Sequence, residues 1–220
     1  MTASRLTYSQ LVQYRDDFPV HWQYPVLRVK DGKTWVAERL KESKHLLDVG
    51  CGRRSFLTEY LLPQGFSGRY VGVDTDPDVH PDYPDVLAIP NHERFDNVVM
   101  LNIVEHVPAT TFLSWLEKLQ TILISSGCIV IVTPNSLNLP QLFCDFTHSQ
   151  FYSLPDLCSI LKAHSFVDIR GYRMAFSPYH PNPLKRELKR VIRALRAPIA
   201  RWVLEADLNC VNIAVEARSP

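Results

Sequence analysis

The sequence contains no apolar run that approaches the ~18 residues a helix needs to cross a bilayer, so we expect no membrane span. It also lacks a signal-peptide pattern, because polar and charged residues, among them Gln10, Gln13 and Arg15, interrupt the stretch from Arg5 to Asp17. Charge of neither sign is in excess, since 24 Lys and Arg against 23 Asp and Glu leave a net charge of +1. No long-range field would therefore draw the chain to nucleic acid or to an anionic membrane. These absences predict a cytoplasmic protein.

Cysteine is scarce, with five residues in a chain of 220. Their odd number and wide spacing favour neither a disulfide framework nor a metal knuckle. No group of His, Cys and Asp residues has the sequence spacing of metal ligands either. We therefore expect a reduced protein whose chemistry does not depend on a metal.

What is present is typical of a soluble globular protein: 46% of the residues are apolar and 21% are charged. The length suits one domain with a sizeable core. Apolar runs alternate with segments of helical periodicity, which predicts an α/β fold with a doubly wound sheet. The predicted strands are 45–49, 69–74, 85–88, 95–101, 128–132, 166–172 and 208–217, and the predicted helices are 33–43, 54–62, 110–123, 153–161 and 184–201.

The stretch 45–56 combines a buried strand, a glycine turn and the start of a helix. The apolar run reaches a carboxylate at Asp48, and Gly50 and Gly52 follow. Glycines allow the backbone a positive φ or a close approach to a ligand, and a helix N-terminus directs free N–H groups toward it. The stretch therefore indicates either a nucleotide-like ligand at the carboxyl end of the sheet or a tight turn with no ligand.

The second predicted strand ends in Asp74, about 24 residues after Gly50, near the distance at which a ribose-binding acid follows a glycine turn. Prolines then crowd the chain at positions 77, 81, 84 and 90. Because proline removes a helical hydrogen bond, the usual crossover helix after this strand should be missing or reduced to a turn.

Together these segments resemble the class I S-adenosylmethionine-dependent methyltransferases, in particular small-molecule enzymes with a Glu-His block after the fourth strand. The resemblance covers roughly residues 44–172. It implies a mostly parallel, seven-stranded Rossmann-like sheet with an antiparallel last strand, and the cofactor S-adenosyl-L-methionine, which leaves as S-adenosyl-L-homocysteine. The motifs that carry it are LDVGCG at 47–52, VGVD at 71–74, FDNVV at 95–99, VEHV at 104–107, the block 127–135, and DFTH at 145–148 followed by 151–152.

The resemblance also implies a set of cofactor-binding residues. Asp48 would bind the methionine ammonium group, Asp74 the ribose hydroxyls, and Asp85 the adenine amino group. Asp82 is the rival of Asp85, because the proline-rich loop makes the register ambiguous, and Val86 or Leu87 would flank the adenine ring. The full implied set is Asp48, Gly50, Cys51, Gly52, Asp74, Thr75, Asp85, Val86, Asn102 and Ile103.

One position departs from the family pattern, since Arg54 stands where the third glycine is expected. Its side chain could point to solvent at the helix N-terminus, although a cation is unfavourable beside that end of the dipole. It could instead reach the carboxylate of the cofactor, or fill the cofactor site and leave a protein that does not catalyse.

Methyl transfer from a sulfonium is an in-line displacement, for which alignment of the reactants accounts for roughly 7–11 kcal/mol of the barrier. An amine acceptor needs only to be neutral, whereas a hydroxyl needs a base. His148 and His106 lie beyond the carboxyl ends of predicted strands, and Asp145 could orient His148. We therefore expect transfer to a hydroxyl of a small molecule or saccharide, with His148 the first choice as base and His106 the second.

The chain reads as one methyltransferase domain over 1–220, with an N-terminal arm (1–32), a cofactor-binding core (44–172) and a helical insertion (173–207). The aromatic arm either packs on the core or walls the substrate pocket, with Tyr152, Tyr179 and His180 as candidate substrate residues. In the insertion, helix 184–201 should bend or end at Pro198. Its apolar and basic faces fit packing on the domain or a partner subunit, a substrate lid, or contact with a membrane or lipid-linked substrate.

Other functions stay open on the sequence alone. The alternatives are an N-methyltransferase of small molecules, a non-catalytic S-adenosylmethionine-binding protein, and an NAD-type oxidoreductase, which shares the glycine turn and the later acid. A nucleic-acid substrate is not expected, because the charge is balanced and an Asn-Pro-Pro-aromatic motif is absent. The chain also leaves an oligomer possible.

Overall fold

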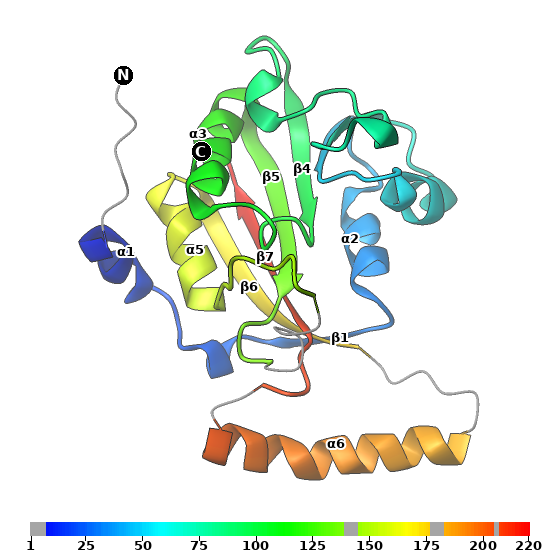
Figure 1. The fold of residues 1–220 in the computed structure, drawn as a ribbon, viewed down its shortest axis with the longest axis vertical. Helices are drawn as coiled ribbons and strands as arrows, with labels where there is room; N and C mark the ends of the chain where they lie inside the picture. The colour runs from blue at the N-terminus through cyan, green and yellow to red at the C-terminus, as the bar shows by residue number, and fades with distance from the viewer. Residues whose placement is uncertain (1–7, 139–144, 177–182, 205–206) are drawn as a thin grey trace.

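The computed structural model describes residues 8–138, 145–176, 183–204 and 207–220. A seven-stranded sheet in the order β1-β6-β7-β5-β4-β2-β3 forms its centre (Figure 1). All neighbouring strands are parallel except β7, which is antiparallel to both β5 and β6. The predicted fold class is thereby confirmed. The strands are β1 (Val26–Val29), β2 (His45–Val49), β3 (Arg69–Val73), β4 (Phe95–Leu101), β5 (Leu123–Pro134), β6 (Val167–Phe176) and β7 (Asn212–Arg218).

Alternation along the central strands divides the core into two layers. In β5, Ile129 and Ile131 belong to one apolar cluster, while Val130 and Val132 belong to the other. This follows because successive strand residues point to opposite faces of a sheet. The first face is covered by α1 (Tyr8–Arg15), α3 (Ala109–Ile122) and α5 (Leu154–Ala163), and the second by α2 (Gly32–Leu40) and the π-helical turn η2 (Leu57–Leu61).

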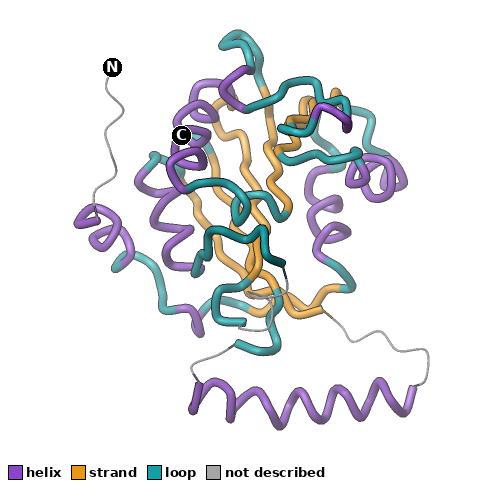
Figure 2. The backbone as a smooth tube through the Cα atoms, viewed as in Figure 1, coloured by secondary structure: helices purple, strands orange, loops and turns teal. Residues whose placement is uncertain are grey.

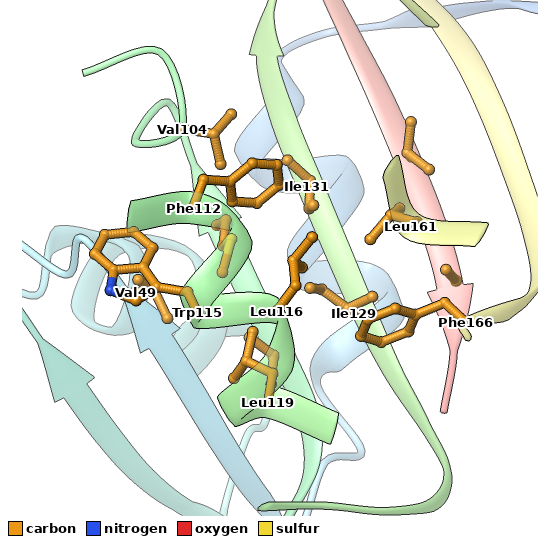
Figure 3. Packing of buried hydrophobic residues seen from close by; sticks show 14 of the residues in the cluster. Val49, Val104, Phe112, Trp115, Leu116, Leu119, Ile129, Ile131, Leu161 and Phe166 are labelled. Atoms are coloured by element: carbon orange, nitrogen blue, oxygen red, sulfur yellow. The ribbon is translucent and has the colours of Figure 1, made fainter. Parts of the chain in front are cut away.

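Helix α3 shows how periodicity builds the first layer. Phe112, Trp115, Leu116 and Leu119 recur at helical spacing, and all four are buried. They lie against β5 at Ile129 and its neighbours (Figure 3). The Glu-His block lies in the sequence between the carboxyl end of β4 and this helix. Packing of the helix on the sheet therefore positions the carboxyl end of β4.

The crossover after β3 lacks a regular helix, as the prolines predict. Two short 3-10 turns, η4 (Pro77–Val79) and η5 (Val86–Ala88), take its place, and Figure 2 shows the rest of this segment as loop. The predicted strand at 85–88 is wrong, because Asp85 caps η5 by accepting a hydrogen bond from Leu87 N. Among the described residues, a single isolated parallel bridge, between Val73 and Tyr83, lies at the β3 edge of the sheet.

The seventh strand comes instead from the N-terminal arm. β1 pairs in parallel with β6 at the opposite edge, with Val26 beside Arg173 and Val29 beside Phe176. The short alternating sequence between Pro25 and the Asp31 cap of α2 is half-exposed. The N-terminal arm is therefore part of the sheet. The prolines that interrupt the arm gave no indication of a strand there.

Helix α6 (Pro183–Leu204) runs beyond the edge of the sheet toward which β4 and β5 point (Figure 1). It continues through Pro198 to Leu204, so of the two expectations for this proline, a bend or an end of the helix, the end is not observed. Within the described residues, no helix combines the length and apolar character needed to cross a membrane.

Candidate functional site

The glycine turn joins β2 to β3 through backbone hydrogen bonds. Gly50 N and Cys51 N both donate to Val73 O, at 2.8 and 3.0 Å. Gly50 has φ 79°, and a Cβ there would lie 2.8 Å from the side chain of Ile103. Gly52 has φ 49°, and no atom lies within 4 Å of where its Cβ would be. The turn therefore needs glycine at both positions, and Gly52 faces open space.

Asp74 follows β3 and lies beside this turn. Its Oδ2 accepts from Gly52 N at 2.8 Å, and its Oδ1 accepts from Asp76 N at 3.0 Å. An ionised carboxylate has about four acceptor positions, so two remain for hydroxyl donors. Thr75, the next residue, is exposed. The structure thus brings Gly52 and Asp74 together, as the spacing predicts.

Asp48 is buried at the end of β2, with 2% of its surface exposed. Its Oδ2 accepts a 2.5 Å hydrogen bond from Tyr70 Oη. Burial raises the pKa of Asp48 to about 6, against the opposing effects of the Tyr70 hydrogen bond and the charge of Lys33. A cationic ligand group at this carboxyl would oppose the effect of burial and lower the pKa, since an opposite charge favours the ionised form.

Arg54 adopts φ 57°, the left-handed conformation for which glycine is usually required. Its Nη2 donates to His80 O and to Asp82 Oδ2, each at 3.1 Å. Asp82 Oδ2 also accepts from Gly72 N. The side chain therefore leaves the turn and joins it to the proline-rich loop, and the interaction with Asp82 was not among the expected ones.

The residues expected around the adenine differ in exposure. Asp85 Oδ1 caps η5, and its Oδ2 accepts from Trp115 Nε1 at 3.3 Å. Val86 is fully buried in the core, whereas Leu87 is 54% exposed. Asn102 is exposed, adopts φ 52°, and accepts from Asn212 Nδ2 at 3.3 Å. Val86 and Leu87 were the two residues expected to flank the adenine ring, and of these Leu87 is the exposed one.

The Glu-His block begins with a buried carboxyl group. Glu105 is 1% exposed, and its Oε2 accepts from Thr133 Oγ1 at 2.9 Å. Burial raises its pKa, and the Thr133 hydrogen bond opposes this. Its carbonyl oxygen accepts from Ser149 N and Gln150 N, which ties the block to the DFTH segment.

The DFTH segment orients His106. Asp145 Oδ1 accepts from both Thr147 N and Thr147 Oγ1, at 2.9 and 2.7 Å. Because the Thr147 hydroxyl donates its one proton to Asp145, it must accept from His106 Nδ1, which lies 2.9 Å away. Neutral His106 then carries its proton on Nδ1 and a lone pair on Nε2.

Asp145 was expected to orient His148, and in the structure it reaches His106 through Thr147 instead. The His148 ring stacks edge-on against the His106 ring, with centroids 4.9 Å apart. Its Nδ1 is buried and has no hydrogen-bond partner among the described residues. Thr147 is thus a site residue that sequence reasoning missed, although it lies inside the DFTH motif.

Of the other buried polar atoms that lack a partner within the described residues, two belong to Glu105 and to the Tyr152 side chain that interacts with it. They are Glu105 Oε1 and Tyr152 Oη. Burial and the charge of Glu105 raise the pKa of Tyr152 to about 12, and its ring packs edge-on against Phe112. One potential ligand atom from each of Glu105, His106 and His148 lies within 4.8 Å of the others, so this group has the spacing to hold a metal ion.

Other predicted positions contribute less. Tyr179 and His180 lie outside the described residues. Cys51 is buried, and burial raises the pKa of its thiol to about 12. A hollow of about 390 Å³ lies at the opposite ends of β2 and β3, away from all of these groups. The candidate site therefore combines the glycine turn, Asp48 and Asp74 with the Glu105–His106–His148 group.

Comparison with known proteins identifies one family by sequence and several solved structures with a similar fold. A family model described as "Methyltransferase domain" matches residues 22–170. A SAM-dependent methyltransferase from Archaeoglobus fulgidus is similar with TM-score 0.62 and 22% identity, over 85% of this chain and 94% of that one. The N-methyltransferase NodS from Bradyrhizobium japonicum WM9 has TM-score 0.53 and 13% identity, over 86% and 94%. The plantazolicin methyltransferase BpumL, in complex with SAH, has TM-score 0.52 and 14% identity, over 99% and 92%. No curated protein matches the chain by sequence.

Proposed function

This chain belongs to the methyltransferase domain family, and on that premise we propose that it transfers a methyl group from S-adenosylmethionine to a hydroxyl group of a small molecule or saccharide. The alternation of strands and helices puts the glycine turn and the Glu-His block at the same edge of the sheet. One edge can then hold the methyl donor and the acceptor side by side.

The described residues fit the cofactor. Gly52 faces open space, and Asp74 beside it retains acceptor positions that suit the two ribose hydroxyls. Asp48 is a buried carboxyl group that gains from a cationic partner, which suits the methionine ammonium group. When bound, S-adenosylmethionine supplies a methyl group on a sulfonium, which leaves as the thioether S-adenosylhomocysteine.

The observation that carries the acceptor side is the group of buried polar atoms without partners. Glu105 Oε1 and His148 Nδ1 belong to the group that contains His106, Tyr152 Oη interacts electrostatically with Glu105, and unpaired buried polar groups cost about 1–3 kcal/mol each. An acceptor that carries hydroxyl groups could satisfy them. Such an acceptor would be a polyol, a saccharide or a small phenol.

In this proposal His106 takes the proton of the acceptor. The acceptor oxygen forms a bond to the methyl carbon while the carbon–sulfur bond breaks, and the hydroxyl proton moves to His106 Nε2. Thr147 and Asp145 hold Nδ1–H in place, so that Nε2 keeps its lone pair for this step. His148 packs against the ring of His106 and contributes to its orientation. A positioned base of this kind accelerates a reaction about a hundred- to ten-thousandfold.

Binding and turnover experiments test the proposal. Calorimetry should show binding of S-adenosylmethionine and S-adenosylhomocysteine and none of NAD, and a methyl-labelled cofactor should label an oxygen in a panel of alcohols, phenols, saccharides and amines. Binding of NAD alone would overturn the proposal. Label found only on amines would move the acceptor to nitrogen, and product binding without turnover on any acceptor would leave a non-catalytic protein.

A pair of variants separates the base from the fold. His106→Gln should lose most of the turnover and keep its affinity for S-adenosylhomocysteine, while His92→Gln at an exposed position should change neither. We also expect turnover to survive EDTA, since the proposed proton acceptor is a free imidazole nitrogen.

A further inference from the structure

Helix α6 carries an apolar stripe that the domain does not cover. Its residues recur three or four positions apart, so they lie along one side of the helix. In a soluble domain such a stripe faces the core, but here the side chains are about half to nine-tenths exposed. They are Leu184 (78%), Leu188 (58%), Val191 (48%), Ile192 (51%), Leu195 (66%), Ile199 (65%) and Trp202 (88%).

The stripe is bordered by cations. At 100° per residue, Lys189 and Arg196 fall on one flank of the stripe, and Arg190 and Arg201 fall farther round the other side. All four side chains are exposed. Acidic residues offer little balance, because the helix contains Glu187 alone, which forms an ion pair with Arg190 at 2.8 Å.

The helix is joined to the domain at its C-terminal end. The Arg201 guanidinium lies 4.9 Å from the ring centroid of Trp22, and Arg173 from β6 approaches the same ring at 5.6 Å. α6 lies on the side toward which β4 and β5 run (Figure 1). The Glu-His block follows β4, and Asp48 lies near the carboxyl end of the parallel strand β2, so both belong to this edge of the sheet. A surface bound to this helix would therefore face the carboxyl edge of the sheet.

We propose that α6 binds the surface of an anionic membrane, with its apolar stripe among the lipid acyl chains and its lysines and arginines at the headgroups. A helix of low mean hydropathy with Leu and Trp on one face and Lys and Arg on the other has the features of an in-plane interfacial helix. Anionic headgroups complement both basic flanks. A second copy of the chain would instead bring like charges together. The inference does not depend on methyl transfer.

Vesicle co-sedimentation of the full chain tests the proposal. Binding is expected to vesicles of phosphatidylcholine with phosphatidylglycerol, to weaken as NaCl is raised, and to be much weaker with phosphatidylcholine alone. Emission from Trp202 should shift to shorter wavelength on binding, and Trp202→Phe should remove most of that shift. Failure to bind the anionic vesicles at low salt would overturn the proposal.

Two adjacent substitutions form a matched pair. Leu195→Glu and Ala194→Glu change the charge equally at neighbouring exposed positions, but only the first lies in the stripe. Leu195→Glu should weaken vesicle binding about tenfold or more, and Ala194→Glu much less. Equal loss in both variants would mean that charge alone accounts for binding and would overturn insertion of the stripe.

Sedimentation velocity tests the alternative that a second copy of the chain covers the stripe. The chain without lipid is expected to keep the same sedimentation coefficient at rising concentration. A dimer that Leu195→Glu dissociates would assign the stripe to a second copy and overturn the membrane proposal. Urea-unfolding midpoints equal to that of the wild type verify that both variants fold.

Discussion

Asp48 shows how one buried carboxyl group connects the fold to the candidate cofactor site. Tyr70 from β3, Lys33 from α2 and Arg54 from the turn lower its pKa, but burial, together with the charge of Asp74, outweighs them and the pKa rises to about 6. Tyr70 was absent from the predicted site, because its hydroxyl meets Asp48 only once β2 and β3 pair. The charge state of this carboxyl group therefore changes in a pH range that is easy to measure.

Affinity for S-adenosylmethionine should fall as Asp48 becomes protonated. With a pKa of about 6, roughly a tenth of the carboxyl groups are ionised at pH 5, so an ammonium-binding role predicts about tenfold weaker binding than at neutral pH. Calorimetry between pH 5 and 7.5 measures this. Asp48→Asn should bind weakly and equally across the range, and a flat profile for the wild type would contradict the role.

Thr147 gives a second prediction at this scale. Thr147→Val removes the hydroxyl between Asp145 and His106 and keeps the shape, so turnover should fall about tenfold or more. The pH profile of turnover should change as well, because the ring is no longer held in one tautomer. Thr147→Ser keeps the hydroxyl and should restore most of the activity. Equal activity in all three proteins would remove Thr147 as a positioning residue.

At the scale of elements, the sheet owes its seventh strand to close contact between the arm and β6. Gly171 in β6 has no side chain where the ring of Tyr24 lies, and a Cβ there would be 2.5 Å from Tyr24 Cε1. Tyr24 is buried, and Arg173 N donates to Pro25 O just beyond it. The edge strand is therefore positioned by a glycine in its neighbour.

Gly171→Ala should destabilise the protein by roughly 1–3 kcal/mol, because the Tyr24 ring must move out of a filled core. Gly32→Ala is the control, since its Cβ would meet Met174 and Phe176 at ordinary contact distance of 3.7 to 3.8 Å. Urea unfolding compares the two. A Gly171→Ala midpoint equal to that of the wild type would show that the arm does not pack against β6 at this position.

At the scale of the whole molecule, Asp207 joins distant parts of the chain. Its Oδ2 lies 3.1 Å from His21 Nε2 in the arm, and 3.4 Å from both Arg173 Nη1 in β6 and Asn135 Nδ2 after β5. Burial would raise the pKa of Asp207, but the His21 hydrogen bond and the Arg173 charge outweigh it, and the pKa is lowered. The ionised carboxylate is the form that holds these segments together.

A lowered pKa fixes the direction of the pH dependence. The stabilisation is present above the unfolded-state pKa of about 3.9 and is lost as the pH falls toward the folded-state value. Asp207→Asn should reduce the free energy of unfolding at pH 7 by roughly 2–3 kcal/mol, and should lose less further stability on acidification than the wild type. Urea unfolding at pH 7 and pH 3 measures both. Parallel losses in the two proteins would contradict this account.

The sequence by itself determined the central elements and the part of the candidate site that we propose for the cofactor. Strands β2, β4 and β5, helices α3 and α5, the glycine turn, Asp74 and the missing crossover helix all follow from apolar runs, helical periodicity and the backbone limits of glycine and proline, which act over a few residues. Only the tertiary structure decided the pairing of β1 with β6, the link from Asp145 through Thr147 to His106, and the exposure of the apolar stripe on α6. These depend on which distant segments meet, and local patterns carry little information about that.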